Sequence, residues 1–235
     1  FWDEDILNHK TLISAMNGIG FLLDGGKFTF EQKIISVLAK REIIEAVRSK
    51  SSIVLSSSDG FDSLPEKTRN TIDLHCSKKG SLLSGCKHLA YPDTGIFIIK
   101  SDRLHLVVSA GPVGQNGNGG HGHNDKLSFE LTVDGEELFL DPGTYLYTAI
   151  PEERNRFRSS LAHNTVLVRG EEQNGWFKGR TGLFSMKPNS KCFLFAIRDD
   201  FIDVGLEYRG IKARRKFTVC DDFLLIESSC NRAYK

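Results

Sequence analysis

From about Leu82 onward, apolar and polar residues alternate along this chain, and this period of two restricts the possible folds more than any other feature. Successive side chains of a β-strand point to opposite faces, so the alternation predicts strands that bury one face. The pattern predicts strands at residues 95–100, 104–110, 127–133, 137–141, 164–168, 192–198, 203–208, 214–219 and 223–227. No helical spacing separates these segments. Strands at this density predict an antiparallel β-sandwich rather than a parallel sheet.

The N-terminal part of the chain has a different pattern. Through residues 1–50, apolar residues recur at helical spacing, with Gly25-Gly26 between two expected helices. Residues 51–79 are rich in Ser, Asp and Lys and have no period, which predicts an irregular connection. We therefore expect a helical part with its connection at residues 1–80 and a β-sandwich at 81–235. The chain begins at Phe1 with neither an initiator Met nor a signal peptide, and we interpret it as a piece of a longer protein.

The charge balance narrows the range of partners. The chain has 31 Lys and Arg residues against 30 Asp and Glu, a formal net charge of +1. A balance this even speaks against a nucleic-acid partner and against binding to anionic membranes. With 40% hydrophobic and 26% charged residues, the composition is typical of a globular domain. The five cysteines form no CxxC pair, so we expect free thiols rather than a cysteine zinc site.

The segment 127–141 predicts a β-hairpin. Asp134-Gly135 suits a two-residue type I′ turn, which needs positive φ at both central residues. In that register Leu131 pairs with Leu138 and Phe129 pairs with Leu140, which places the apolar residues of both strands on one face. Asp141 then points to the opposite face, at the end of its strand.

The glycine-rich segment 114–125 is the strongest candidate for chemistry. It has five glycines around His121 and His123. A phosphate loop is excluded, because the segment lacks the Gly-Lys-Ser/Thr ending and precedes a strand rather than a helix. The His-x-His spacing supplies two neighbouring imidazoles, either as two ligands or as one ligand and one acid–base group. Asp141 and His163 are the candidate further donors for a zinc site with an open position.

Two other classes of function agree with the same residues. In a zinc hydrolase of the metallo-β-lactamase type, His121, His123 and Asp125 would open a His-x-His-x-Asp-His motif, but Lys126 stands where that motif needs its last His. In a non-catalytic carbohydrate-binding or structural sandwich, exposed aromatic residues such as Trp176 and Tyr145 would contact the ligand.

Three blocks of this sequence resemble the signature segments of the heparinase II/III-like family. They are Gly-Gly-His121-Gly-His123-Asn-Asp125-Lys, Phe-Leu-Asp141-Pro-Gly-Thr-Tyr145 and Arg158-Ser-Ser-Leu-Ala-His163-Asn-Thr-Val, and their order and spacing also match. The resemblance covers about residues 85–230. It implies a polysaccharide lyase with a helical (α/α) toroid followed by an antiparallel, supersandwich-like β-domain. Residues 1–50 would then be the end of a toroid whose bulk is absent.

The resemblance also implies roles for four residues. His121 falls on the catalytic histidine of the β-domain, while His123, Asp141 and His163 fall on the metal ligands. This set suits Zn²⁺, with Ca²⁺ or another divalent ion as the alternative. The implied substrate is an acidic, uronic-acid-containing polysaccharide, cleaved by β-elimination in the periplasm or outside the cell.

Part of the implied active site is missing from this chain. Family members also use a Tyr and an Asn or Glu from the toroid, and no residue in 1–80 matches them, so we expect the fragment alone to be inactive. We interpret the arginines at 154, 156 and 158 as solvated or ion-paired and leave them out of the catalytic set. The expected hairpin register also conflicts with the implied ligands: His123 and Asp141 converge only if the chain turns or bulges between Asn124 and Leu127.

Overall fold

The structure is a computed structural model that describes residues 57–65, 70–76, 79–117 and 119–232. The chain divides into two compact units, Phe1–Ser52 and Ile53–Lys235, and every described residue belongs to the second. The two helices expected in residues 1–50 lie outside the described residues. Within the described part, no helix is long and apolar enough to cross a membrane.

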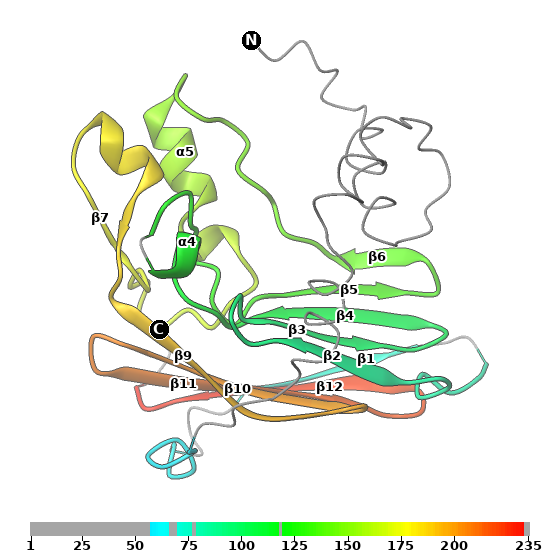
Figure 1. Ribbon diagram of the computed structural model, residues 1–235. Coiled ribbons are helices and arrows are strands. Elements are labelled where there is room, and N and C mark those ends of the chain that lie inside the picture. Colours follow the sequence, from blue (N-terminus) through cyan, green and yellow to red (C-terminus); the bar gives the residue numbers. More distant parts are fainter. Residues whose placement is uncertain (1–56, 66–69, 77–78, 118, 233–235) are drawn as a thin grey trace, which may run out of the picture. The chain divides into compact units, whose positions relative to one another are not determined.

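Two five-stranded antiparallel sheets form the β-sandwich (Figure 1). The first has the order β1-β12-β11-β10-β9 and the second the order β2-β3-β4-β5-β6. The strands of the first sheet are β1 (Asn70–His75), β9 (Ser190–Arg198), β10 (Phe201–Tyr208), β11 (Ile211–Val219) and β12 (Phe223–Cys230). The strands of the second are β2 (Lys87–Tyr91), β3 (Ile96–Lys100), β4 (Leu104–Ser109), β5 (Phe129–Val133) and β6 (Glu136–Phe139).

The predicted fold class, an antiparallel β-sandwich, is confirmed. Buried and less buried residues alternate strictly along β4 and β11, so each strand has one face toward the space between the sheets. Phe97, Leu106 and Leu131 from the second sheet and Val204 and Phe217 from the first belong to a single buried apolar cluster. This shared core holds the two sheets face to face.

The irregular connection expected over residues 51–79 is wrong for Asn70–His75. This segment is β1, which pairs antiparallel with β12 along its whole length. As an edge strand it is mostly exposed and has only Leu74 partly buried, so it lacks the apolar alternation that revealed the central strands. The strand predicted at 164–168 is also absent, although Val166 and Val168 are buried in the core.

The hairpin of β5 and β6 has the predicted turn but not the predicted register. Asp134 and Gly135 have φ of 53° and 81°, as a type I′ turn requires. A bulge then shifts the pairing, so that Leu131 lies opposite Phe139 rather than Leu138. Phe139 packs on Phe129 with ring centroids 4.9 Å apart, whereas Leu138 is 50% exposed. The extra residue reverses which face of β6 is buried.

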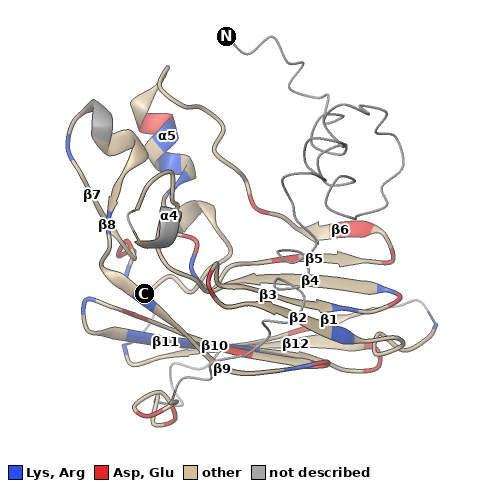
Figure 2. Ribbon diagram, viewed as in Figure 1, with Lys and Arg blue, Asp and Glu red and all other residues tan. Residues whose placement is uncertain are grey.

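Short elements lie outside the two sheets. Figure 1 shows α4, α5 and β7 gathered on one side of the sandwich. These elements are α4 (Gly114–Gly117), α5 (Pro151–Phe157), the 3₁₀ helices η2 (Ser160–Ala162) and η3 (Arg180–Phe184), and the paired strands β7 (Gly175–Trp176) and β8 (Met186–Lys187). Charged positions of both signs lie on α5 (Figure 2), and Pro151 begins this helix at a position that needs no backbone donor.

Candidate functional site

His123, Asp141 and His163 lie together, with one potential ligand atom from each residue within 4.8 Å of the others. They come from three separate segments. His123 is in the loop between α4 and β5, Asp141 follows β6, and His163 directly follows η2. No other group of three or more His, Cys, Asp or Glu side chains at metal-ligand spacing occurs in the part of the chain that the structure describes.

Two local features let these segments converge. The chain reverses at residues 125–128, where the Ser128 N–H donates to the Asp125 carbonyl at 3.0 Å and Leu127 adopts a φ of +66°. This is the turn that the sequence required between Asn124 and Leu127. The second feature is the bulge in β6. Because of its extra residue, the side chains of Phe139 and, two residues later, Asp141 lie on the side of the strand that the predicted register had given to Leu138 and Leu140.

Asp141 and His163 form a hydrogen-bonded pair. His163 Nδ1 lies 2.8 Å from Asp141 Oδ2, and the Gly143 N–H donates to Oδ1 of the same carboxylate at 2.8 Å. Burial raises the pKa of Asp141, but the hydrogen bonds from His163 and Gly143 outweigh it and hold the pKa below its ordinary value. The carboxylate is therefore ionised, as a metal ligand must be.

The two imidazoles of the group lie close together and offer nitrogen donors. Their ring centroids are 5.4 Å apart. Burial, and next the neighbouring His163, lower the pKa of His123, which favours the neutral form that binds metals. The His163 side chain has no exposed surface, and its Nε2 is buried with no hydrogen-bond partner among the residues that the structure describes. A buried nitrogen without a partner is costly unless something binds it.

This donor set fits a divalent metal. Two imidazole nitrogens and one carboxylate oxygen match the ligands of zinc sites that keep an open position. Ca²⁺ prefers six or more oxygen donors, which the three side chains do not supply. Of the ions left open by the sequence, the geometry therefore favours Zn²⁺.

His121 is exposed and belongs to a different set of contacts. It has a φ of +55°, and its N–H donates to the Phe184 carbonyl at 2.9 Å. Its ring centroid lies 5.3 Å from that of Phe184 and 6.0 Å from that of Tyr147. His121 is not among the three residues whose ligand atoms gather. Its ring therefore lies outside the candidate metal group and packs with the rings of Phe184 and Tyr147.

Arg154 is a residue of this site that the sequence analysis misjudged. It is 1% exposed, and its Cζ lies 4.9 Å from the Tyr147 ring and 5.0 Å from the Phe184 ring. The guanidinium therefore packs against the rings of Tyr147 and Phe184, which are the two aromatic neighbours of His121. Burial lowers its pKa. Its Nη1 has no hydrogen-bond partner among the described residues.

Arg158 is buried as well, so the expectation of solvated or ion-paired arginines holds only for Arg156. Arg156 bonds to Glu153 at 2.7 Å on the surface. Arg158 donates to the carbonyls of Gly182 and Ser185 at 2.6 and 3.3 Å, and burial lowers its pKa to about 10. Residues 154 and 158 are four apart, a spacing that puts both on the inner side of α5. This spacing was the feature of the sequence from which the burial of both arginines could have been predicted.

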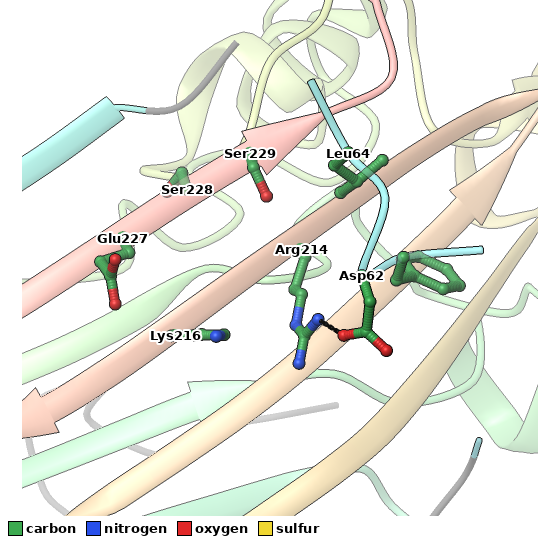
Figure 3. A pocket seen from close by; sticks show the side chains of 8 residues that line it. Asp62, Leu64, Arg214, Lys216, Glu227, Ser228 and Ser229 are labelled. Carbon is green, nitrogen blue, oxygen red and sulfur yellow. Dashed lines mark hydrogen bonds and ion pairs between the residues drawn. The ribbon is translucent and has the colours of Figure 1, made fainter. Parts of the chain in front are cut away.

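One hollow adjoins the candidate metal group, since Pro142 beside Asp141 and Ala162 beside His163 line it, and a second lies apart from the group. A cavity of about 690 Å³ borders α5 and η2, with apolar walls from Phe157, Leu161 and Trp176. A smaller one of about 130 Å³ lies beside the first sheet (Figure 3). In the smaller hollow Arg214 already bonds to Asp62 and Asp203, so its charge is balanced within the protein.

Asp125 does not take part in the metal group. Its Oδ1 lies 2.8 Å from Nζ of the buried Lys126, with which it forms an ion pair. The set of His121, His123 and Asp125 that a zinc hydrolase would use is therefore not assembled within the described residues.

Comparisons with known proteins agree with the family resemblance of the three sequence blocks. A family model described as "Heparinase II/III-like, C-terminal" matches residues 86–232. A heparin-sulfate lyase from Bacteroides stercoris is 34% identical over 82 residues, which are 32% of this chain and 12% of that protein. The chain thus spans only a small part of the curated relative.

Solved structures of similar proteins extend well beyond this chain too. A heparinase III described as the BT4657 gene product has a TM-score of 0.44 and 23% identity, over 60% of this chain and 21% of that one. The heparan sulfate lyase HepC from Pedobacter heparinus has a TM-score of 0.44 and 18% identity, with the same coverage.

Proposed function

The chain belongs to the heparinase II/III-like family, and we propose that it is the β-domain share of a polysaccharide lyase that cleaves an acidic glycosaminoglycan by β-elimination. The observation that carries the proposal is the group of His123, Asp141 and His163, with the exposed His121 two residues from His123 in the chain. All four residues lie within the matched segment. The names of the relatives, a heparin-sulfate lyase and heparan sulfate lyases, support this class of substrate.

β-Elimination at a uronic acid needs three operations. The carboxylate of the sugar must be neutralised so that the C5 proton becomes acidic, a base must take that proton, and an acid must protonate the departing O4 oxygen. We assign proton transfer or carboxylate neutralisation to the imidazole of His121. A second proton-transfer group, the phenol of Tyr147, lies beside it.

The metal has an organising role in this proposal. His123, Asp141 and His163 would hold Zn²⁺, whose fixed positive charge would order the glycine-rich segment when bound. Because His121 and His123 are separated by one glycine, anchoring His123 restricts where His121 can lie. The chain's own residues then present the His121 ring against Phe184 and Tyr147.

Lyase turnover is tested by the chromophore that it creates. β-Elimination leaves a C4–C5 double bond conjugated to the carboxylate, so ultraviolet absorbance rises without water entering the product. We expect the isolated chain to be inactive and the same chain joined to a complete toroid to be active. In the active form, His121→Ala should lower turnover by about 10²–10⁴-fold. His105→Ala, an exposed histidine on β4, is the matched control and should leave turnover unchanged.

Other results would favour another function. Full activity of the isolated chain would contradict a shared active site. A completed protein that binds acidic glycans but never cleaves them would instead support a non-catalytic carbohydrate-binding domain. That alternative rests on the exposed Tyr145, which stacks on Phe157 with ring centroids 4.8 Å apart near the larger cavity.

A further inference from the structure

We propose that Glu172 is a positioning residue that sets the distance between His123 and His163. This inference rests on the proposed metal group and adds a residue to it that neither the sequence blocks nor the family match assigns. Glu172 is followed by Gln173 and Asn174, and we call these three residues the 172–174 clamp. The clamp lies between η2 and β7 in the chain.

The Glu172 carboxylate bonds to both histidine-bearing segments at once. Its Oε2 accepts from Asn124 Nδ2 at 2.6 Å, and Asn124 directly follows His123. The same oxygen accepts from the Ser160 N–H at 2.9 Å and from the Ser160 hydroxyl at 3.1 Å. Its Oε1 accepts from the Ser159 hydroxyl. Ser159 and Ser160 form the start of the turn that delivers His163.

Gln173 and Asn174, the other two residues of the clamp, form further hydrogen bonds to the same segments. The Asn174 N–H and side-chain amide donate to Asn124 Oδ1 at 2.9 and 3.0 Å. Gln173 accepts from the Lys126 N–H at 2.9 Å and donates to the Thr165 hydroxyl at 3.0 Å. Asn124, Gln173 and Asn174 have no exposed surface. Buried amides that satisfy one another in this way hold a single arrangement rather than several.

A carboxylate is the side chain that this position requires. All four groups that reach Glu172 are donors, and an ionised carboxylate accepts without needing to donate. Glu172→Gln keeps the shape but turns an NH₂ group toward at least one of those donors. A neutral amide also accepts more weakly than a carboxylate. Glu172→Gln therefore weakens the bonds to Asn124 and Ser160, which share Oε2, and loosens both segments together.

The control is the neighbouring residue. Glu171→Gln makes the same chemical change one position away, and the Glu171 carboxylate forms a long ion pair with Arg232 at 3.9 Å, away from the two histidine-bearing segments. Zinc affinity of the full chain is measured by competition with a chelator. We expect Glu172→Gln to weaken zinc binding by about 10–100-fold, as loss of groups that orient metal ligands does. Glu171→Gln should match the wild type.

A second measurement needs no metal. In the metal-free full chain, the His163 Nδ1 proton that is shared with Asp141 should give a protected imidazole resonance by NMR. We expect Glu172→Gln to broaden or abolish this signal at a temperature where the protein is folded, and Glu171→Gln to retain it. If the wild type binds no zinc, the metal group of the proposed function fails, and this signal still decides the role of Glu172.

The outcomes separate positioning from simple stabilisation. Unchanged zinc affinity and an unchanged imidazole signal in Glu172→Gln would overturn the proposal, even if the unfolding temperature fell. Equal losses in Glu171→Gln would overturn it as well. If Glu172→Gln does not fold, Ser160→Ala is the milder variant. It removes the hydroxyl's bond to Glu172 and the long bond that this hydroxyl accepts from the Gln173 N–H at 3.5 Å, and it should weaken zinc binding in the same direction by about 3–10-fold. No weakening in that variant would then refute the clamp.

Discussion

Replacing Asp141 by Asn gives the most direct test of the pair that Asp141 forms with the buried imidazole of His163. The substitution keeps the size of the side chain but removes the charge that strengthens its bond to His163, where Nδ1 and Oδ2 are 2.8 Å apart. A hydrogen bond to a charged group contributes roughly 1.5–3 kcal/mol. The Asp141 side chain is 32% exposed, so solvent screening reduces the expected loss to about 1–2 kcal/mol.

The chain contains a matched control for this substitution. His88 Nδ1 lies 2.7 Å from Asp199 Oδ1, which is the same chemical pair at nearly the same distance. Both partners are far more exposed, at 33% and 64%, against 0% for His163. Asp199→Asn should therefore leave stability unchanged within the error of the measurement, because exposed pairs are screened by water.

Thermal unfolding in excess chelator provides the assay. For a domain of this size, about 1 kcal/mol shifts the unfolding temperature by roughly 2–4 °C, so Asp141→Asn should lower it by about 2–8 °C. When zinc is added, the wild type should gain stability and Asp141→Asn should gain much less. Equal unfolding temperatures for Asp141→Asn and Asp199→Asn in chelator would refute the argument from burial. Equal gains with zinc would refute the ligand assignment of Asp141.

Three further predictions follow from the same geometry. Purified full chain should hold about one zinc per molecule by elemental analysis; His123→Ala should abolish it and His121→Ala should not, so equal losses would contradict the division of roles. The pKa of His123 is lowered by folding, so the unfolded state binds the extra proton more readily, and metal-free protein should lose stability as the pH falls below about 6.5. Urea unfolding at several pH values should show this loss in the wild type and a smaller one in His123→Ala. Arg158→Lys should destabilise by about 2–4 kcal/mol, because a lysine cannot reach both the Gly182 and Ser185 carbonyls, and an unchanged urea midpoint would contradict it.

Strands whose side chains alternate between core and surface were predictable from the sequence. Residues 214–219, for example, fall within β11, which lies in the middle of the first sheet. The Asp134-Gly135 turn was equally clear, because both residues must adopt positive φ. The edge strand β1 was missed, since an exposed strand pairs through its backbone and leaves little trace in its side chains.

The candidate site was less predictable from the sequence than the strands were. His121 and His123 attract notice as neighbours in a glycine-rich segment, and this local pattern was readable. Their separation into an exposed ring and a half-buried candidate ligand was not readable, because it depends on Phe184 and Tyr147 for His121 and on His163 for His123. The role of Glu172 left no local signal at all, since its partners are 12, 13 and 48 residues away.

Spacing along the chain was enough to predict the sandwich and the hairpin turn, and it drew attention to the histidines of the candidate metal group. The face on which Asp141 lies depended on one extra residue in β6, whose bulge is set by the packing of Phe139 against Phe129. The burial of Arg154 likewise depended on the rings of Tyr147 and Phe184 that cover it. The periodicity of apolar residues shows which face of a helix or strand is buried. Register shifts and polar networks depend instead on contacts between segments that only the folded chain brings together.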